Sequence, residues 1–402
     1  MFPNNLNKIN LIFFIPFLWC VTGLLFYGDA PKDMVAIALV TMVTFLVTYG
    51  YKEAITNFKG SIISQLVAFF LCFIIAMDVY QGYSSTAIRA FSVSLVVLIF
   101  TPRIVIDKIR ENLHLIIFVG SLSSFSFVVY EFYVLDTGRY WSINPVRYTT
   151  ISCMLAMLSL MMLVLYENIK IRIISLISLL MSLNVLILGQ TRGTLLAFVM
   201  SVMVFFLLLK VMGKLKIGYK FLTLLAIASL PFLYLNKQVI EIRYETTINE
   251  ISNISAGNLD TSIGLRLQMW KSGLDMIKSS PFIGYGNSHF EEKKLQYKEG
   301  FISKQTAVFT HYHNQFIDSF VKLGVIGFLF LILVFSAPWY LYYKNKTSIN
   351  LMMSIVSFAY IVASLTDVPL YHPQTIIVYF ILMSIMDLDK ELMANHNQES
   401  IQ

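Results

Sequence analysis

Histidines and arginines lie at the edges of long apolar stretches in this chain. Thr310-His311-Tyr312-His313-Asn314 runs directly into a hydrophobic segment, and Arg192 lies in the short turn Gly189-Gln190-Thr191-Arg192-Gly193 between two others. Arg266 lies in the one long loop. Arginine forks bind phosphate through paired N–H groups, and neutral imidazole can accept a proton near neutral pH. These residues could therefore hold a lipid-linked phosphate and perform chemistry beside it.

The composition indicates an integral membrane protein. The chain has 402 residues, of which 57% are hydrophobic and 13% charged, and its mean hydropathy is +0.70. This is too much apolar surface for an ordinary soluble domain. We predict an all-α, polytopic transmembrane bundle with about 12 spans, because each crossing needs about 20 apolar residues. The predicted spans are 10–27, 34–50, 61–78, 86–102, 113–133, 148–166, 173–189, 194–212, 221–235, 316–341, 350–366 and 371–387.

Loop charges indicate the orientation of these spans. If the N-terminus lies inside, most Lys and Arg residues fall in short cytoplasmic segments, as membrane proteins generally show. The short outside segments then hold only Lys32, Arg89, Arg139, Arg147 and Arg192. The net charge of +7 follows mainly from this topology, so we predict contact with membrane lipids and no nucleic-acid partner.

The same topology divides the chain into four parts. Residues 1–235 would form the first nine spans, 236–312 a large outer loop, 313–390 the last three spans and 391–402 a cytoplasmic tail. In the loop, Leu265, Met269, Trp270, Leu274 and Ile277 recur mostly at three- and four-residue spacing, which predicts an amphipathic helix at the membrane interface. Arg192, Arg266 and the histidine motif would then share the outer face.

The order of these motifs resembles the O-antigen ligase and polymerase superfamily. The resemblance rests on Gln190-Thr191-Arg192-Gly193, on Arg266 and Trp270 ahead of Pro281-Phe282-Ile283-Gly284-Tyr285-Gly286, and on His311-Tyr312-His313-Asn314 ahead of Gly324-Val325-Ile326-Gly327. It implies a glycosyltransferase of the GT-C type in the bacterial inner membrane. Such an enzyme moves a glycan from undecaprenyl diphosphate to an acceptor at the periplasmic face, without a metal or cofactor. By position, Arg192 and Arg266 would bind the diphosphate, and His313 would serve the acceptor hydroxyl.

Each assignment has a simpler alternative. Arg192 could contact lipid headgroups, Arg266 could lie on a solvated helix face, and His313 could pack at a helix start that Asn314 caps. His311 is the alternative working histidine. The two histidines could also suggest a metal, but no third ligand stands at a suitable spacing, so we predict no metal site.

Further candidates lie in two other outer segments. Arg139 and Arg147 flank Asn144-Pro145 and resemble a family loop near the donor, although anchoring at the interface explains them equally well. His372, in Tyr371-His372-Pro373, is a weaker candidate. Asp318 and Lys322 are four residues apart, so on a helix they would form a structural ion pair.

We predict an O-antigen ligase that transfers glycan from undecaprenyl diphosphate to lipid A-core. The nearest alternative is an O-antigen polymerase, which uses a lipid-linked glycan as acceptor; the compact histidine motif favours the ligase. A flippase or other transporter of lipid-linked oligosaccharides is a third interpretation. Transporters commonly show internal repeats and charges at the membrane midplane, whereas here no repeat is visible and the candidates gather at one face.

Overall fold

The computed structural model describes residues 8–138, 140–213, 234 and 237–386. In these residues the chain forms helices and no strand. Among the described residues, eight helices are long and apolar enough to cross a membrane. They are Lys8–Leu25 (η1, α1 and η2), α2 (Ala30–Thr48), α4 (Ile62–Gln81), Leu113–Val134 (α7 and η3), α8 (Pro145–Leu165), α9 (Ile169–Leu188), α10 (Arg192–Val211) and α16 (Gln315–Asn345).

The remaining predicted spans are shorter or bent. The helix α5 (Ser85–Ile99) passes the same test only together with α6 (Arg103–Glu111), to which it is bent by 96°. The apolar helices α17 (Ser348–Ser364) and α18 (Pro373–Met383) have 17 and 11 residues, less than the ~20 that a bilayer crossing needs. The predicted span 221–235, apart from Tyr234, and the predicted tail 391–402 lie outside the described residues.

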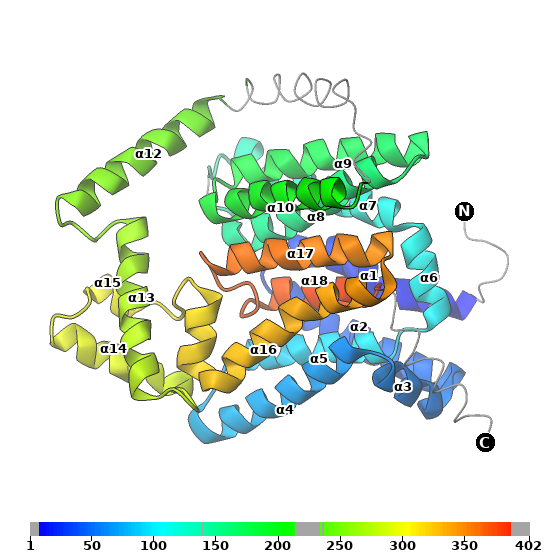
Figure 1. Ribbon diagram of the computed structural model, residues 1–402, viewed down its shortest axis with the longest axis horizontal. Helices are drawn as coiled ribbons and strands as arrows, with labels where there is room; N and C mark the ends of the chain where they lie inside the picture. Colours follow the sequence, from blue (N-terminus) through cyan, green and yellow to red (C-terminus); the bar gives the residue numbers. More distant parts are fainter. Residues whose placement is uncertain (1–7, 139, 214–233, 235–236, 387–402) are drawn as a thin grey trace.

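The helix α8 forms the centre of the bundle. Of its spanning window, 89% is buried inside the protein, and α7, α9, α10 and α17 pack around it (Figure 1). Asn144 begins the helix by accepting a hydrogen bond from the N–H of Val146, and Pro145 occupies the first turn. Proline is favoured there because the first N–H groups of a helix have no partner within it.

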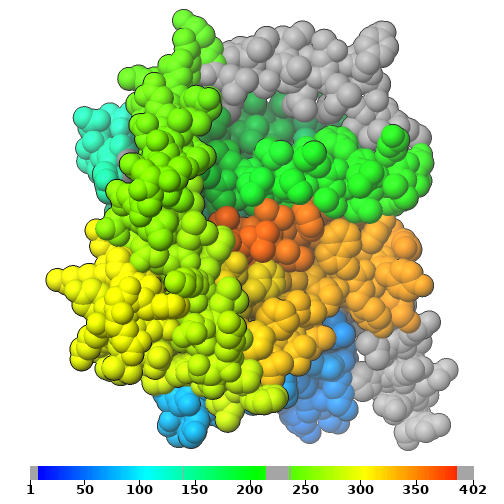
Figure 2. Space-filling model, turned by 60° about the vertical axis from the view of Figure 1, so that its left-hand side comes forward, coloured from blue at the N-terminus to red at the C-terminus, as the bar shows by residue number. Residues whose placement is uncertain are grey.

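Helices of the predicted outer loop gather at one end of the bundle (Figure 1). They are α12 (Lys237–Ser255), α13 (Ser262–Ser279), α14 (His289–Lys298) and α15 (Lys304–Ala307). Much of the predicted outer loop is therefore helical. The apolar residues expected on one helix lie on α13, where Met269 is buried against Tyr312, although Leu274 is exposed. Figure 2 looks onto this end and shows α12 and α13 beside α10 and α16.

A break in α16 joins two of the sequence motifs. Gly324 adopts φ 61° and ψ −158°, a conformation open essentially only to glycine. In a continuous helix the N–H of Val325 would bond the carbonyl of Val321. Here the Val325 N–H donates to Pro281, and Val321 accepts from the N–H of Tyr285. The turn that ends α13 is thus inserted at the break.

Candidate active site

The turn between α9 and α10 presents Arg192 at the first position of α10. Gln190 adopts a positive φ of 51°, which is uncommon for a residue other than glycine. The hydroxyl of Thr191 donates to that of Thr149 on α8 at 2.6 Å, which ties the turn to the central helix. The Arg192 guanidinium contacts Glu250 of α12 through two nitrogens, at 2.7 and 3.2 Å.

A pocket at this end of the bundle brings three arginines together. Arg192, Arg243 and Arg266 all line it. Its other polar lining residues are Thr150, Thr191, Thr194, Ser262, Thr366 and Asp367. Arg243 also donates from Nε to the carbonyl of Gln190 at 2.9 Å. Cations from three helices, α10, α12 and α13, therefore surround one volume, which suits an anionic ligand with several oxygens.

Two arginine nitrogens in this region are buried without a hydrogen-bond partner. They are Nε of Arg192 and Nε of Arg147, at the start of α8. Buried N–H groups normally find an acceptor, and an unpaired one costs about 1–3 kcal/mol. An anionic oxygen in the pocket could supply the acceptor that Arg192 lacks.

The histidine motif forms the irregular segment before α16. His313 has a positive φ of 47°. The next residue, Asn314, caps the helix by accepting from the N–H groups of Phe316 and Ile317 at 3.0 and 3.2 Å. Its amide also donates to the carbonyl of Leu365 at 3.4 Å. Asn314 thus has the capping role and also ties the histidine segment to the loop between α17 and α18.

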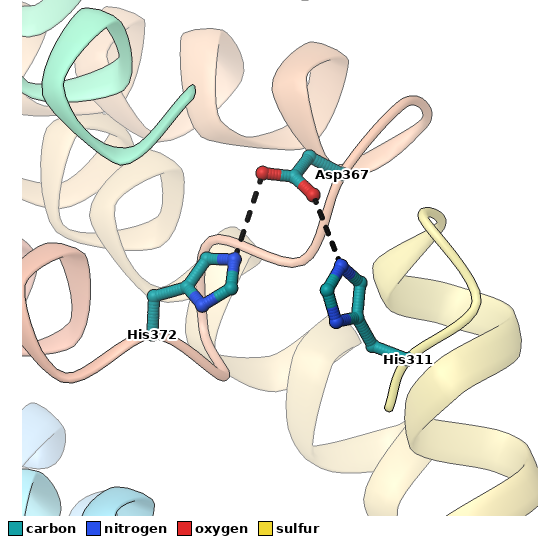
Figure 3. Close-up of side chains that lie close together, drawn as sticks. All are labelled: His311, Asp367 and His372. Atoms are coloured by element: carbon teal, nitrogen blue, oxygen red, sulfur yellow. Dashed lines mark ion pairs between the residues drawn. The ribbon is translucent and has the colours of Figure 1, made fainter. Parts of the chain in front are cut away.

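Asp367 lies in that loop and gathers three histidines. Its Oδ1 is 3.1 Å from Nδ1 of His313 and 3.8 Å from Nε2 of His311, and its Oδ2 is 3.7 Å from Nε2 of His372. Figure 3 shows the rings of His311 and His372 directed at this carboxylate from two segments of the chain. Only the contact with His313 is short enough for a good hydrogen bond. Because Asp367 also lines the arginine pocket, the two groups of candidates are contiguous.

The environment sets the charge of these groups. Burial raises the pKa of the Asp367 carboxyl, but the interactions with His313 and His372 outweigh it and hold that pKa well below its usual value. Burial and the neighbouring His313 lower the pKa of His311 to about 2. Burial also lowers the pKa of His372, although Asp367 opposes the shift. Near neutral pH, Asp367 is therefore an anion beside neutral His311 and His372.

Buried lysines hold the backbone of the histidine motif. Lys322 lies 2.9 Å from Asp318, as the spacing predicted, and donates to the carbonyl of Thr310 at 3.0 Å. Asp318 accepts from the N–H of Tyr312 at 3.2 Å. Lys293 of α14 is fully buried and donates to the carbonyl of Phe309 at 2.5 Å. The pair predicted as structural therefore also positions the candidate histidines.

One group among the described residues has the geometry of a metal site. Candidate ligand atoms of His311, Asp367 and His372 lie within 4.8 Å of one another. Burial has the largest effect on both histidines and lowers their pKa values. Asp367 raises both, and its effect is larger than the lowering by Lys322 at His311 and by Arg147 at His372. The absence of a metal site therefore stays a prediction.

The predicted residues therefore converge only in part. Arg192 and Arg266 share the pocket, whereas His311, His313 and His372 meet at Asp367. Arg139 lies outside the described residues.

Sequence reasoning missed Arg243, Glu250 and Asp367. Asp367 carried a usable signal, since an acidic residue at the end of an apolar span is costly and often functional. Arg243 and Glu250 carried none, because they lie on a helix of ordinary polar composition.

Comparison with known proteins identifies the matching domain. Residues 176–332 match the family model described as O-antigen ligase, and this range contains Arg192, Arg266 and His313. The matched segment, less than half of the chain, is similar to an O-antigen ligase domain, and it lies within a multi-pass helical membrane protein. The resemblance inferred from the motifs is thereby confirmed.

Three relatives match parts of the chain. An O-antigen ligase of Escherichia coli K12 is 27% identical over 189 residues, 46% of this chain and 44% of that protein. An uncharacterized protein of Haemophilus influenzae Rd is 37% identical over 114 residues, 28% of this chain and 29% of that protein. The exopolysaccharide production protein ExoQ of Rhizobium meliloti 1021 is 29% identical over 98 residues, 21% of this chain and 22% of that protein. The chain thus matches less than half the length of each relative.

Proposed function

We propose that this protein is an O-antigen ligase, which transfers a glycan from undecaprenyl diphosphate to lipid A-core at the periplasmic face of the bacterial inner membrane. The observation that carries the proposal is the shared pocket, in which Arg192, Arg243 and Arg266 lie beside Asp367, the partner of His313. An anion-binding group and a proton-accepting group are thereby adjacent, as transfer from a diphosphate requires.

The arginines would stabilise the leaving group. As the bond between the anomeric carbon and the diphosphate oxygen breaks, its electron pair passes to undecaprenyl diphosphate. Fixed guanidinium groups stabilise this growing negative charge, which lowers the barrier because they are already oriented before the reaction. Because fixed arginines can supply this stabilisation, we propose that the reaction needs no metal ion.

His313 would act as the general base. Its Nδ1 lies 3.1 Å from Asp367, an arrangement that fixes the proton on Nδ1 and leaves Nε2 with a lone pair. The acceptor hydroxyl forms the new bond to the anomeric carbon, and its proton passes to Nε2. Asp367 then stabilises the imidazolium, so it is a positioning residue, whereas His313 touches the substrate.

A transfer assay with purified protein tests this function. Labelled undecaprenyl diphosphate glycan is supplied with either lipid A-core or a second lipid-linked glycan, in detergent and without compartments. A ligase transfers to lipid A-core. Transfer only to the lipid-linked glycan would instead identify a polymerase, and no transfer to either acceptor would leave transport as the better explanation.

Variants of the two motif histidines test the mechanism. We expect His313→Ala to reduce the transfer rate by about 10²- to 10⁴-fold, the usual cost of losing a general base, while donor binding persists. His311→Ala should have a smaller effect, because its contact with Asp367 is longer. If His311→Ala is the inactive variant, the roles are exchanged; if neither loses more than a few-fold, histidine base catalysis is wrong.

A further inference from the structure

An acidic residue, Glu250, contacts one of the arginines that line the arginine pocket. Glu250 is buried, with 9% of its surface exposed, and both its carboxylate oxygens contact the guanidinium of Arg192. Glu250 is not among the residues that line the pocket, whereas Arg192 is. The carboxylate therefore approaches Arg192 from outside the pocket.

The bonding of Arg192 leaves N–H groups for a second anion. A guanidinium has five N–H donors, and two contacts go to Glu250 through the terminal nitrogens. Nε is buried and has no hydrogen-bond partner. Arginine can offer one edge to a carboxylate and the adjacent edge to a phosphate, because its donors form a rigid planar fork.

The helix that carries Glu250 is itself fixed against the same turn. Arg243 lies about two turns before Glu250 on α12, so the two side chains share a face of the helix. Arg243 donates to the carbonyl of Gln190, two residues before Arg192. The chain therefore attaches α12 to the turn at two points, a backbone carbonyl and the Arg192 side chain.

We propose that Glu250 is a positioning residue for the donor: it holds Arg192 so that the remaining N–H edge of the guanidinium faces the diphosphate. The inference rests on the proposed function and extends it to a residue outside the family motifs. A long side chain that is held in advance loses less conformational entropy when the ligand binds. Glu250 thereby strengthens binding of an anion although it is itself an anion.

The opposite effect is the natural competing expectation. If the carboxylate merely occupied the phosphate position, its removal would free Arg192 and tighten donor binding. Loss of a negative charge near the pocket would act in the same direction by simple electrostatics. The sign of the change in affinity therefore separates positioning from competition.

The experiment measures binding of undecaprenyl diphosphate without glycan to the purified full chain in detergent, together with donor KM and kcat for transfer. We expect Glu250→Gln to weaken binding and raise donor KM by about tenfold, which corresponds to about 1.4 kcal/mol, with little change in kcat. Glu245→Gln is the matched control. It removes an equal charge from an exposed position of α12 and should leave both quantities unchanged.

A double-variant comparison excludes a general loss of folding. In an Arg192→Gln background, Glu250→Gln should have no further effect on lipid diphosphate affinity, because there is no guanidinium left to position. Equal weakening in both backgrounds would overturn the inference, as would unchanged or tighter binding by Glu250→Gln. If the wild-type protein itself does not bind the lipid diphosphate, the proposed function fails as well.

Discussion

Replacing Asp367 by Asn tests the centre of the proposed mechanism with little change of shape. The substitution removes the negative charge that lies 3.1 Å from His313. The contacts with His311 and His372 are longer, at 3.8 and 3.7 Å, so the main loss falls on His313. An amide also cannot stabilise an imidazolium as a carboxylate does, and a flipped amide would favour the wrong tautomer of the ring.

The expected size of the effect follows from this distance. Unit charges about 3 Å apart attract by roughly 5 kcal/mol at an effective dielectric constant of about 20, and the amide dipole recovers part of this. A remaining loss of about 3–5 kcal/mol corresponds to a decrease in kcat of roughly 10²- to 10⁴-fold. Donor binding should not weaken, because the arginines do not depend on Asp367 for their charge and the substitution removes a negative charge from the pocket lining.

The assay compares kcat, donor affinity and thermal stability for Asp367→Asn, His313→Ala and the double variant. Residues that act as a unit are not additive, so the double variant should be no slower than His313→Ala. A kcat for Asp367→Asn within fivefold of wild type would refute the reasoning. A double variant whose loss of kcat equals the product of the two single losses would also refute it, because Asp367 would then act independently of His313.

Three further predictions concern the other charged groups. Arg192→Lys should lose most transfer activity at normal expression, because an ammonium cannot reproduce two-point contact; wild-type activity would remove Arg192 from the site. A chelator should leave transfer intact, and strict dependence on an added divalent cation would overturn the metal-free mechanism. Burial, with the charge of Lys322, lowers the pKa of Lys293 from 10.5 to about 7, although Asp318 opposes the shift. Between these values the unfolded chain binds a proton that the folded chain lacks, so stability should rise with pH by up to about 1.4 kcal/mol per unit. Thermal unfolding of Lys293→Met from pH 7 to 9 should show a smaller rise than wild type.

Local patterns predicted much of the helical framework. Apolar length identified the helices that became α2, α4, α8 and α9, because burial of an apolar segment depends on its own composition. The same rule was less informative for α18, which has only 11 residues. The loop that holds Asp367 and His372 precedes it, and Pro373 begins the helix later than hydropathy suggested.

The sequence predicted candidate residues better than their partners. Arg192, Arg266 and His313 stood out because they lie in ordered motifs that resemble one family and, in the predicted topology, share one face. Asp367 lies 54 residues from His313 in the chain, and no local spacing indicates that the loop between α17 and α18 folds against the start of α16. The contact depends on tertiary bonds, such as the one from the N–H of Leu370 to the side chain of Gln315 at 2.7 Å.

The two halves of the site meet because of a glycine in the arginine motif. Gly193 follows Arg192 at the start of α10, and a Cβ at this position would overlap the side chain of Thr366. Thr366 immediately precedes Asp367. The same pocket is lined by both of these residues and by Arg192 and Gly193. A small residue beside the arginine therefore lets the loop that carries the carboxylate approach closely. The motif therefore supplies the cation, Arg192, and also the space, at Gly193, that allows Asp367 and its partner His313 to lie beside it.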